Sequence, residues 1–318
     1  MRSEDAVTTV RQEAGWIKLG RLGLIRVGGP HRVKFLHNLL SNDITSLTPG
    51  HSRLAALMNL KGQQVAWMRV LAEADALICE LPLSVREIVV DTFIHYKVGA
   101  PVRFEKPDAT IFGLFGARAA ETLRSLGLEA VPEQFETFAA TEAKGGPLRV
   151  SRGRDMPASG FTLHRNPAGA AVLDEALRAM LGEPISENSL ETLRVEEGIP
   201  WHGVDVTEEN LLHETGQLAL YHSSTKGCYL GQEVVARLEG RGGNVNKHLR
   251  GLKLSAAATA GAEVTDDDKV IGRVTSVGQS PEFGAIAMGF VHRSHADPGT
   301  PVRVNGALAR VVALPFAS

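Results

Sequence analysis

Hydrophobic and polar positions divide the chain into two parts with different periodicities. Up to residue 245, stretches in which apolar and polar residues alternate are mixed with stretches at helical spacing. From residue 246 onward only short alternating stretches remain, separated by turns with Gly, Asp and Pro. Strand-only content of this kind predicts a small β-barrel or sandwich. The strands expected in this part are residues 249–254, 269–277, 285–291, 301–304 and 309–314.

The first part, residues 1–245, has the pattern of a mixed α+β region. Residues 53–71 predict a β-hairpin, because two apolar runs flank the turn Lys61-Gly62. Ser186 is the expected N-cap of a helix over residues 189–197. No Gly-rich phosphate loop follows a strand, which excludes Rossmann and P-loop nucleotide sites. Further strands are expected at 17–27, 76–81, 102–104, 109–115 and 161–164, and further helices at 31–40, 85–96, 116–126 and 170–181.

Residues 131–153 are weakly patterned and contain Gly145-Gly146-Pro147, which predicts a loop-rich segment. The order of strands and helices does not fit a doubly wound parallel sheet. The sequence therefore predicts an α+β fold in which residues 1–245 form two interleaved subdomains, with boundaries near residues 55 and 157. A C-terminal β-barrel domain, residues 246–318, is expected to follow.

Composition and charge narrow the class of protein. The 318 residues are 43% hydrophobic and 22% charged, as in ordinary globular proteins, and the net charge of −2 gives no overall attraction to nucleic acid or membrane. The sequence shows no bilayer-spanning run and no secretory signal pattern at its start, so we expect a cytosolic protein. Two cysteines, Cys79 and Cys228, are too few for a disulfide framework or a structural zinc site, and no metal site is predicted.

The densest cluster of reactive side chains is residues 226–237, which read KGCYLGQEVVAR. Helical spacing begins at Gln232, so Cys228 lies a few residues before a helix N-terminus and close to Lys226. Both a helix N-terminus and a nearby cation favour the thiolate over the thiol, which predicts a reactive Cys228. The alternative is a small buried hydrophobic residue, which is our expectation for Cys79 inside its apolar strand.

Two glycines lie within this cluster. Gly227 and Gly231 are expected to adopt a positive φ or to allow another group to approach the backbone closely. Glu233 falls in the first turn of the predicted helix, where a negative charge suits the helix dipole.

The string KGCYLGQEVVAR resembles the signature of the YgfZ family, folate-binding proteins related to the glycine-cleavage T-protein, an aminomethyltransferase. Residues 35–44, FLHNLLSNDI, and residues 193–205, LRVEEGIPWHGVD, resemble other elements of the T-protein fold. The resemblance implies a T-protein-like multidomain fold and tetrahydrofolate as the cofactor, with Glu196 bonding the pterin. It also implies that Cys228 is a functional thiol assisted by Lys226 and Arg237, and that Asn42 or Asp43 borders the ligand cavity. The further residues expected to bind the cofactor are Arg194, Gly227, Tyr229, Gln232 and Glu233.

One position departs from the family's catalytic pattern. T-protein enzymes place an aspartate on the early hairpin for proton transfer, and the corresponding residue here is Trp67. An indole cannot take up a proton, so this route of general acid–base catalysis is missing. Whether the chain is an enzyme is therefore left open, although folate binding is still expected.

Three functions follow from these residues. The first is a folate-binding accessory protein that supports assembly or repair of iron–sulfur clusters in enzymes, including tRNA-modifying ones. The second is a tetrahydrofolate-dependent aminomethyltransferase, disfavoured by Trp67. The third is a thiol hydrolase in which Cys228 pairs with His222 or His213.

The expected partners are a reduced folate and iron–sulfur client proteins or assembly factors. We expect a monomeric chain that contacts neither a membrane nor, directly, a nucleic acid. The identity of the clients and the bound form of folate stay open.

Overall fold

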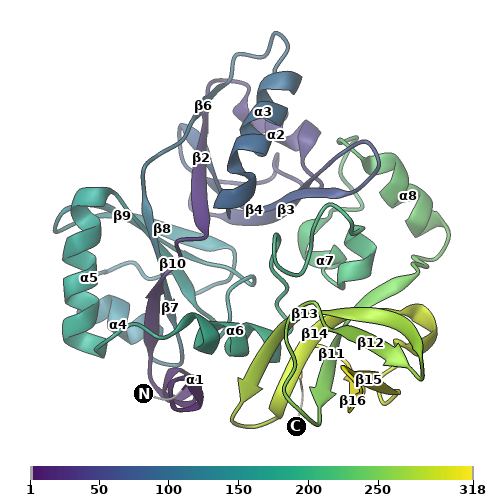
Figure 1. Cartoon of the computed structure of the whole chain (residues 1–318). Coiled ribbons are helices and arrows are strands. Elements are labelled where there is room, and N and C mark those ends of the chain that lie inside the picture. The colour runs from purple at the N-terminus through teal and green to yellow at the C-terminus, as the bar shows by residue number, and fades with distance from the viewer. Residues whose placement is uncertain (1–2, 317–318) are drawn as a thin grey trace.

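The computed structural model describes residues 3–316, which form two five-stranded sheets and a closed barrel arranged around a common centre (Figure 1). In the first sheet the strand order is β3-β4-β5-β2-β6, and every neighbouring pair is antiparallel. Its strands are β2 (Leu22–Gly28), β3 (Ser52–Met58), β4 (Gln64–Ala72), β5 (Ala76–Pro82) and β6 (Arg103–Glu105), with helices α2 (Arg32–Leu39), η1 (Leu83–Val85) and α3 (Arg86–Tyr96).

The second sheet has the order β1-β7-β10-β9-β8 and is also antiparallel throughout. It takes its first strand from the N-terminal end of the chain and the other four from beyond residue 109, so the two sheets are interleaved in sequence. Its elements are α1 (Ser3–Gln12), β1 (Gly15–Lys18), β7 (Thr110–Phe115), α4 (Ala119–Ser125), β8 (Thr137–Ala143), β9 (Gly146–Arg152), β10 (Phe161–Arg165) and α5 (Pro167–Leu181).

The C-terminal strands close into a six-stranded barrel in the order β11-β14-β13-β12-β15-β16, because β11 pairs with both β14 and β16. Its elements are β11 (Lys247–Leu254), β12 (Glu263–Asp266), β13 (Lys269–Ser280), β14 (Gly284–His292), η3 (Arg293–His295), β15 (Pro301–Val304) and β16 (Ala307–Val312). The fold class expected from the sequence, mixed α+β subdomains followed by a small barrel, is confirmed.

Four helices connect the sheets to the barrel: α6 (Glu187–Glu196), η2 (Leu212–Thr215), α7 (Leu218–Tyr221) and α8 (Gln232–Gly240). Helix α6 begins as predicted, since the Ser186 hydroxyl accepts a hydrogen bond from the Ser189 amide at 3.1 Å. It packs on β13 of the barrel and on α1. Helix α7 lies between the first sheet and the barrel, near the centre of Figure 1.

The prediction of a loop-rich segment over residues 131–153 is wrong for its second half. Residues 137–152 form the hairpin β8-β9, whose turn contains Gly145 and Gly146 with φ of 93° and 106°. Most β8 side chains are partly or fully exposed, so the strand lacks the apolar alternation by which it could have been recognised. The sequence analysis also missed α1, whose Val7 and Val10 pack into the core beside the second sheet.

Candidate functional site

A small central cavity lies where the first sheet, residues 155–156 and residues 200–202 meet α7. Its walls carry four aromatic or imidazole side chains: Trp67, Trp201, His202 and Tyr221. In the structure it has a volume of about 40 Å³, well below the hundreds of cubic ångströms typical of cofactor sites. A heterocycle can therefore enter only if a wall side chain moves.

Trp67 forms one wall of this central cavity. Its ring is 4% exposed and stacks on Tyr221 with ring centroids 4.2 Å apart. Its indole N–H donates to Gln64 Oε1 at 2.9 Å, so the one polar atom of the side chain is occupied. Trp67 therefore contributes an apolar surface to the cavity and no proton acceptor.

The carboxylates that line the cavity, Glu80 and Asp155, are held as counter-ions of Arg69. The Arg69 side chain is fully buried; it bonds Asp155, lies 3.6 Å from Glu80, and donates to Ser151 Oγ at 2.8 Å. Burial by itself would raise the pKa of Glu80, but Arg69 and a hydrogen bond with His164 outweigh it and lower that pKa to about 2. A carboxylate with so low a pKa is a poor proton acceptor at neutral pH.

Four polar atoms of residues in the cavity wall are buried without a hydrogen-bond partner among residues 3–316: Arg21 Nε, Arg69 Nε, Trp201 Nε1 and His202 Nδ1. The Arg21 guanidinium lies over the Trp201 ring, 3.1 Å from its centroid. Desolvation, aided by repulsion from Arg194, lowers the pKa of Arg21 to about 9. Buried polar atoms are rarely left unpaired, so four of them in one cavity point to a ligand.

A second, outer cavity of about 380 Å³ is lined by sequence neighbours of central-cavity residues: Arg154 precedes Asp155, and Leu220 precedes Tyr221. Arg53 and Arg154 place two cations in its wall. Its remaining lining residues include Asn42, Glu136 and 222–225.

Asn42 and Asp43, expected to border the ligand cavity, serve mainly to fix the chain. The Asn42 side-chain amide donates to Leu54 O at 2.9 Å and to Leu220 O at 3.1 Å, which ties β3 to α7. Burial opposes ionisation of Asp43, but hydrogen bonds from Ser46 and Thr45 lower its pKa below the usual value. Of the two, only Asn42 lines the outer cavity.

Residues 226–231, the cysteine loop, lie between the outer cavity and α8. Cys228 is exposed, whereas Cys79 is buried in the core, where burial raises the pKa of its thiol to about 12. The Lys226 ammonium donates to the carbonyls of His37, Leu40 and Asn42 at the C-terminal end of α2. Lys226 therefore anchors the loop to α2, and the reactivity of Cys228 stays a prediction.

The two glycines of the cysteine loop differ. Gly231 has φ of 82°, and a Cβ there would lie 2.5 Å from the Asn59 carbonyl oxygen, so glycine is required for the loop to meet the β3-β4 turn. Nothing lies within 4 Å of a Cβ built on Gly227, and its φ lies outside the positive region, so the expectation fails at that residue. Tyr229 is buried with Trp67 and Tyr221, which joins the loop to the cavity wall.

Comparison with known proteins matches both parts of the chain. The model of the GCVT N-terminal domain matches residues 2–221, and that of the glycine cleavage T-protein C-terminal barrel domain matches residues 247–317.

The chain belongs to the glycine cleavage T-protein family.

Individual relatives extend over nearly the whole chain. A chloroplastic "putative transferase" of Arabidopsis thaliana is 26% identical over 93% of this chain and 69% of its own length. The aminomethyltransferase of Streptomyces avermitilis is 28% identical over 98% of this chain and 88% of its own length. The crystal structure of glycine cleavage system aminomethyltransferase T from Bartonella henselae superposes with a TM-score of 0.90 at 23% identity, covering 99% of this chain and 89% of that one, which shows the shared fold.

Within this T-protein fold, the predicted pterin ligand Glu196 does not line the central cavity. It is 3% exposed at the end of α6, where one carboxylate oxygen bonds Arg11 of α1 at 2.6 Å. The other oxygen, Oε1, is buried and has no partner among residues 3–316. Glu196 thus keeps one oxygen available for a ligand, on the side of α6 that faces α1.

Arg194, another predicted cofactor-binding residue, is occupied by the protein. Its guanidinium bonds Glu191, Asp205, the Ile199 carbonyl and Ser276 of the barrel. All five N–H groups have acceptors, so none is free for a ligand. Arg194 connects α6 to the barrel.

The remaining predicted residues lie on or beside the cysteine loop. Gln232 Oε1 accepts from the Tyr229 amide at 3.3 Å, which closes the turn into α8. Glu233 and Arg237 form an exposed ion pair one turn apart on that helix. These residues lie on the loop and helix that follow Cys228, whereas Glu196 and Arg194 lie on α6.

The cavity residues Arg21, Trp201, His202 and Tyr221 were not among the candidates from the sequence. They come from three segments, the turn before β2, residues 201–202 and α7, and no local motif joins Arg21 to Trp201. The string PWHG at 200–203 was a usable signal, because Trp201 and His202 lie within the same resembled stretch, residues 193–205, that carries Glu196.

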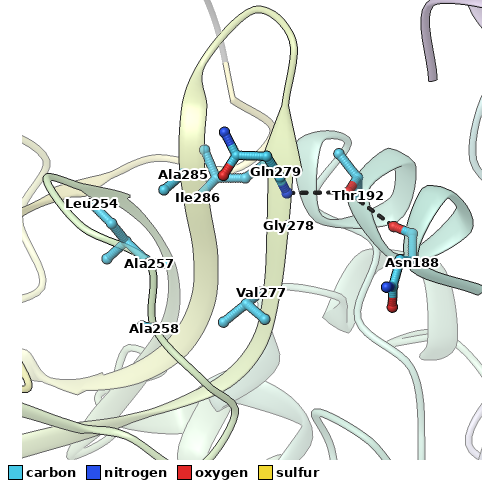
Figure 2. Close-up of a pocket in the computed structure, with 10 residues that line it drawn as sticks. All are labelled: Asn188, Thr192, Leu254, Ala257, Ala258, Val277, Gly278, Gln279, Ala285 and Ile286. Carbon is cyan, nitrogen blue, oxygen red and sulfur yellow. Dashed lines mark hydrogen bonds between the residues drawn. The ribbon is translucent and has the colours of Figure 1, made fainter. Parts of the chain in front are cut away.

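A separate cavity of about 270 Å³ lies between α6 and the barrel, and Figure 2 shows its residues. Its wall contains Leu254, Val277 and Ile286 and no titratable side chain. The Gln279 amide donates to Thr192 Oγ1 at 3.2 Å, which fixes β13 to α6 (Figure 2). This cavity offers no charged group to a ligand.

Between Ser3 and Phe316, no group of three or more His, Cys, Asp or Glu side chains is placed to hold a metal ion. In the same part of the chain no helix is both long and apolar enough to cross a bilayer.

Proposed function

We propose that this chain is a folate-binding protein of the YgfZ type, which holds a reduced folate in the central and outer cavities and does not carry out aminomethyl transfer. The observation that carries the proposal is the wall of the central cavity, which combines aromatic rings with four buried polar atoms that lack partners. Trp67 stands in that wall where a catalytic carboxylate would be needed.

The residues fit a folate in two ways. Trp67, Trp201 and Tyr221 offer flat surfaces to a pterin ring, and the unpaired atoms offer hydrogen bonds to its edge. Arg53 and Arg154 in the outer cavity offer cations to the carboxylates of the glutamyl tail.

The central cavity has to widen to admit the ring. Tyr221 lines the central cavity and its sequence neighbours Leu220 and His222 line the outer one, so we infer that displacement of the Tyr221 side chain joins the two. Tetrahydrofolate, when bound, would supply a carrier for one-carbon units at its ring nitrogens.

The cysteine loop supports the second half of the proposal, an accessory role toward iron–sulfur enzymes. Cys228 is an exposed thiol on a loop fixed at both ends, by Lys226 to α2 and by Gly231 to the β3-β4 turn. A single thiol cannot hold a cluster, so contact with cluster or thiol would be shared with a client protein or assembly factor. We propose that this accessory role toward iron–sulfur enzymes is carried out in the cytosol.

Aminomethyl transfer is the second candidate, because the relative from Streptomyces avermitilis, named an aminomethyltransferase, matches 98% of the chain. The carboxylates of the central cavity argue against it, since both are counter-ions of Arg69.

The test combines binding and turnover. Calorimetric titration with tetrahydrofolate should show one bound folate per chain, and incubation with an aminomethyl-lipoyl donor should yield no protein-dependent methylenetetrahydrofolate. Binding accompanied by turnover would establish the transferase, and absence of binding would refute the folate assignment. The accessory role is tested in cells, where Cys228→Ala should fail to support iron–sulfur enzyme activity; full complementation would refute that role.

A further inference from the structure

A groove of about 400 Å³ is lined by α2, by the segment that follows α3 and by Leu230 of the cysteine loop. Two of its lining residues, Phe35 and Leu39 of α2, are buried and belong to the core of the first sheet. The Phe35 ring packs against Phe93 and Phe104, with ring centroids 5.8 and 5.5 Å away. The apolar floor of the groove is therefore part of a packed core and is formed before any partner binds.

The segment after α3 presents apolar side chains to solvent at this groove. Val98 is 91% exposed, the largest exposed fraction among the large hydrophobic side chains of residues 3–316, and Tyr96 is 38% exposed. Gly99 follows with φ of 71°, and a Cβ built on it would meet nothing within 4 Å, so the turn is open to solvent there. A lone exposed valine is ordinary, but one that lines a groove with a buried apolar floor marks an interaction surface.

The polar side chains of the groove give it a positive end. Lys34 is exposed and forms no ion pair with any carboxylate of residues 3–316. The other polar lining residues are His31 and Asn38, and no Asp or Glu of the described chain lines the groove. Lys34 lies in the first turn of α2, where the helix dipole is itself positive and no acidic residue offsets it. An acidic side chain on a partner is the complement of this end.

The groove is continuous with the cysteine loop. Leu230 follows Cys228 by two residues, so their Cα atoms lie within about 7 Å of each other. Lys226 of the same loop donates to carbonyls at the C-terminal end of α2, the helix that lines the groove. The groove and the exposed thiol are thus held in one framework, and a chain seated in the groove has its neighbouring residues within reach of Cys228.

We propose that this groove docks a segment of the iron–sulfur client or assembly factor in which a large apolar residue lies beside an acidic one. The apolar side chain packs between α2 and Val98, and the acidic side chain pairs with Lys34. Docking brings the partner's own cysteine or cluster next to Cys228. The inference rests on the proposed accessory role and adds to it the surface used and the chemistry of the partner.

Because the client is unidentified, the probe is a library of random dodecapeptides displayed on phage and selected against the full-length protein. The selected peptides should share a large apolar residue next to Asp or Glu. Synthetic copies should bind about 10-fold or more weakly to Val98→Asp, which sets a carboxylate against the acidic residue. Val270→Asp, the same change at an exposed valine of the barrel, is the matched control and should bind them as the parent chain does.

Charge reversal tests the acidic half of the partner. Selection against Lys34→Glu should yield peptides with Lys or Arg in place of the acidic residue, whereas Lys34→Arg should yield the same peptides as the parent chain. In cells, Val98→Asp and Lys34→Glu should fail to support iron–sulfur enzyme activity, as we expect of Cys228→Ala. Both should still bind tetrahydrofolate with the affinity of the parent chain, and Val270→Asp should complement fully.

The outcomes separate this inference from the function on which it rests. If Cys228→Ala complements fully, the accessory role is wrong and the docking proposal falls with it. If Cys228→Ala fails but Val98→Asp and Lys34→Glu complement fully, the accessory role stands and the groove is not its docking site. A selection that yields no acidic preference, or no peptide weakened by a Val98→Asp variant that is folded by circular dichroism, overturns the proposal as well. A dimer in sedimentation velocity that Val98→Asp dissociates would assign the groove to a second copy of the chain instead.

Discussion

The central cavity and the cysteine loop meet at Tyr229, yet they present opposite kinds of surface. In the cavity, aromatic rings, Arg69 and Glu80 are buried, Asp155 is partly buried, and several buried polar atoms are left unpaired. In the loop, the thiol of Cys228 is exposed and the charged side chains that follow it, Glu233 and Arg237, lie in solvent. Buried groups recognise a small ligand, whereas an exposed thiol is suited to a protein partner.

This difference implies that the two regions can be changed independently. The chemistry of the cavity depends on packing and desolvation, so substitutions there should alter stability and affinity strongly. The chemistry of the loop depends on access, so substitutions there should leave the fold and the folate affinity intact. Four substitutions or conditions test that contrast.

The largest effect is expected from Arg69→Met. Removing this guanidinium leaves the buried carboxylate of Glu80 without its cationic partner, which should lower the free energy of unfolding by about 3–5 kcal/mol. Denaturant titration measures it. Arg237→Met, which breaks an exposed ion pair beside the cysteine loop, should change stability by less than about 1 kcal/mol. Equal losses of unfolding free energy in the two variants would contradict the expected difference between the central cavity and the cysteine loop.

The second effect is acid destabilisation through Glu80. Its pKa is lowered from 4.5 to about 2 in the folded protein, so the folded state favours the ionised form. The contribution of ionised Glu80 to the free energy of unfolding is fully present above pH 4.5 and is lost as the pH falls toward about 2. The lowering of the pKa corresponds to a contribution of about 3 kcal/mol. Between these pH values, the free energy of unfolding should depend less on pH in Glu80→Gln than in the parent chain. The same pH dependence in both proteins would show that Glu80 is not held in its ionised form.

Glu196→Ala tests whether the ligand site extends beyond the cavity wall. Because Glu196 Oε1 is buried and unpaired, we expect the variant to bind tetrahydrofolate about 1.5–3 kcal/mol more weakly, the worth of hydrogen bonds to a charged group. Calorimetry measures this change. Arg11→Met, which removes the partner of the other oxygen and keeps the carboxylate, is the matched control and should bind folate. Unchanged affinity in Glu196→Ala would limit the site to the two cavities.

The smallest effect is expected from Cys228→Ala, which should change the free energy of unfolding by less than about 0.5 kcal/mol because the side chain is exposed. Its folate affinity should equal that of the unmodified protein. In the parent chain, pulsed alkylation with peptide mapping should label Cys228 before Cys79, whose thiol is buried and has a raised pKa. Faster labelling of Cys79 would reverse the assignment.

Local patterns predicted those parts of the fold that are determined locally. The hairpin β3-β4 follows from two apolar runs around Lys61-Gly62, and the start of α6 follows from Ser186. The cysteine loop was recognised because its residues are contiguous, and Gly231 was correctly expected to meet another backbone.

The cavity could not be predicted in the same way. Arg21, Trp67, Trp201 and Tyr221 lie in four separate elements and become neighbours only when the sheets pack around α7. Arg194 illustrates the converse: the resemblance suggested a ligand contact, but its acceptors come from α6, residues 199–205 and the barrel. Long-range contacts of this kind leave no periodic trace in the sequence.

The central claim is that the cavity binds a reduced folate, and one titration tests it most directly. Tetrahydrofolate added to the full-length protein should quench the fluorescence of the tryptophans, because Trp67 and Trp201 line the cavity, and the quenching should saturate at one equivalent. Saturation at one equivalent is the result that the account predicts. A fluorescence signal unchanged by tetrahydrofolate, with no heat of binding in the same samples, would contradict it.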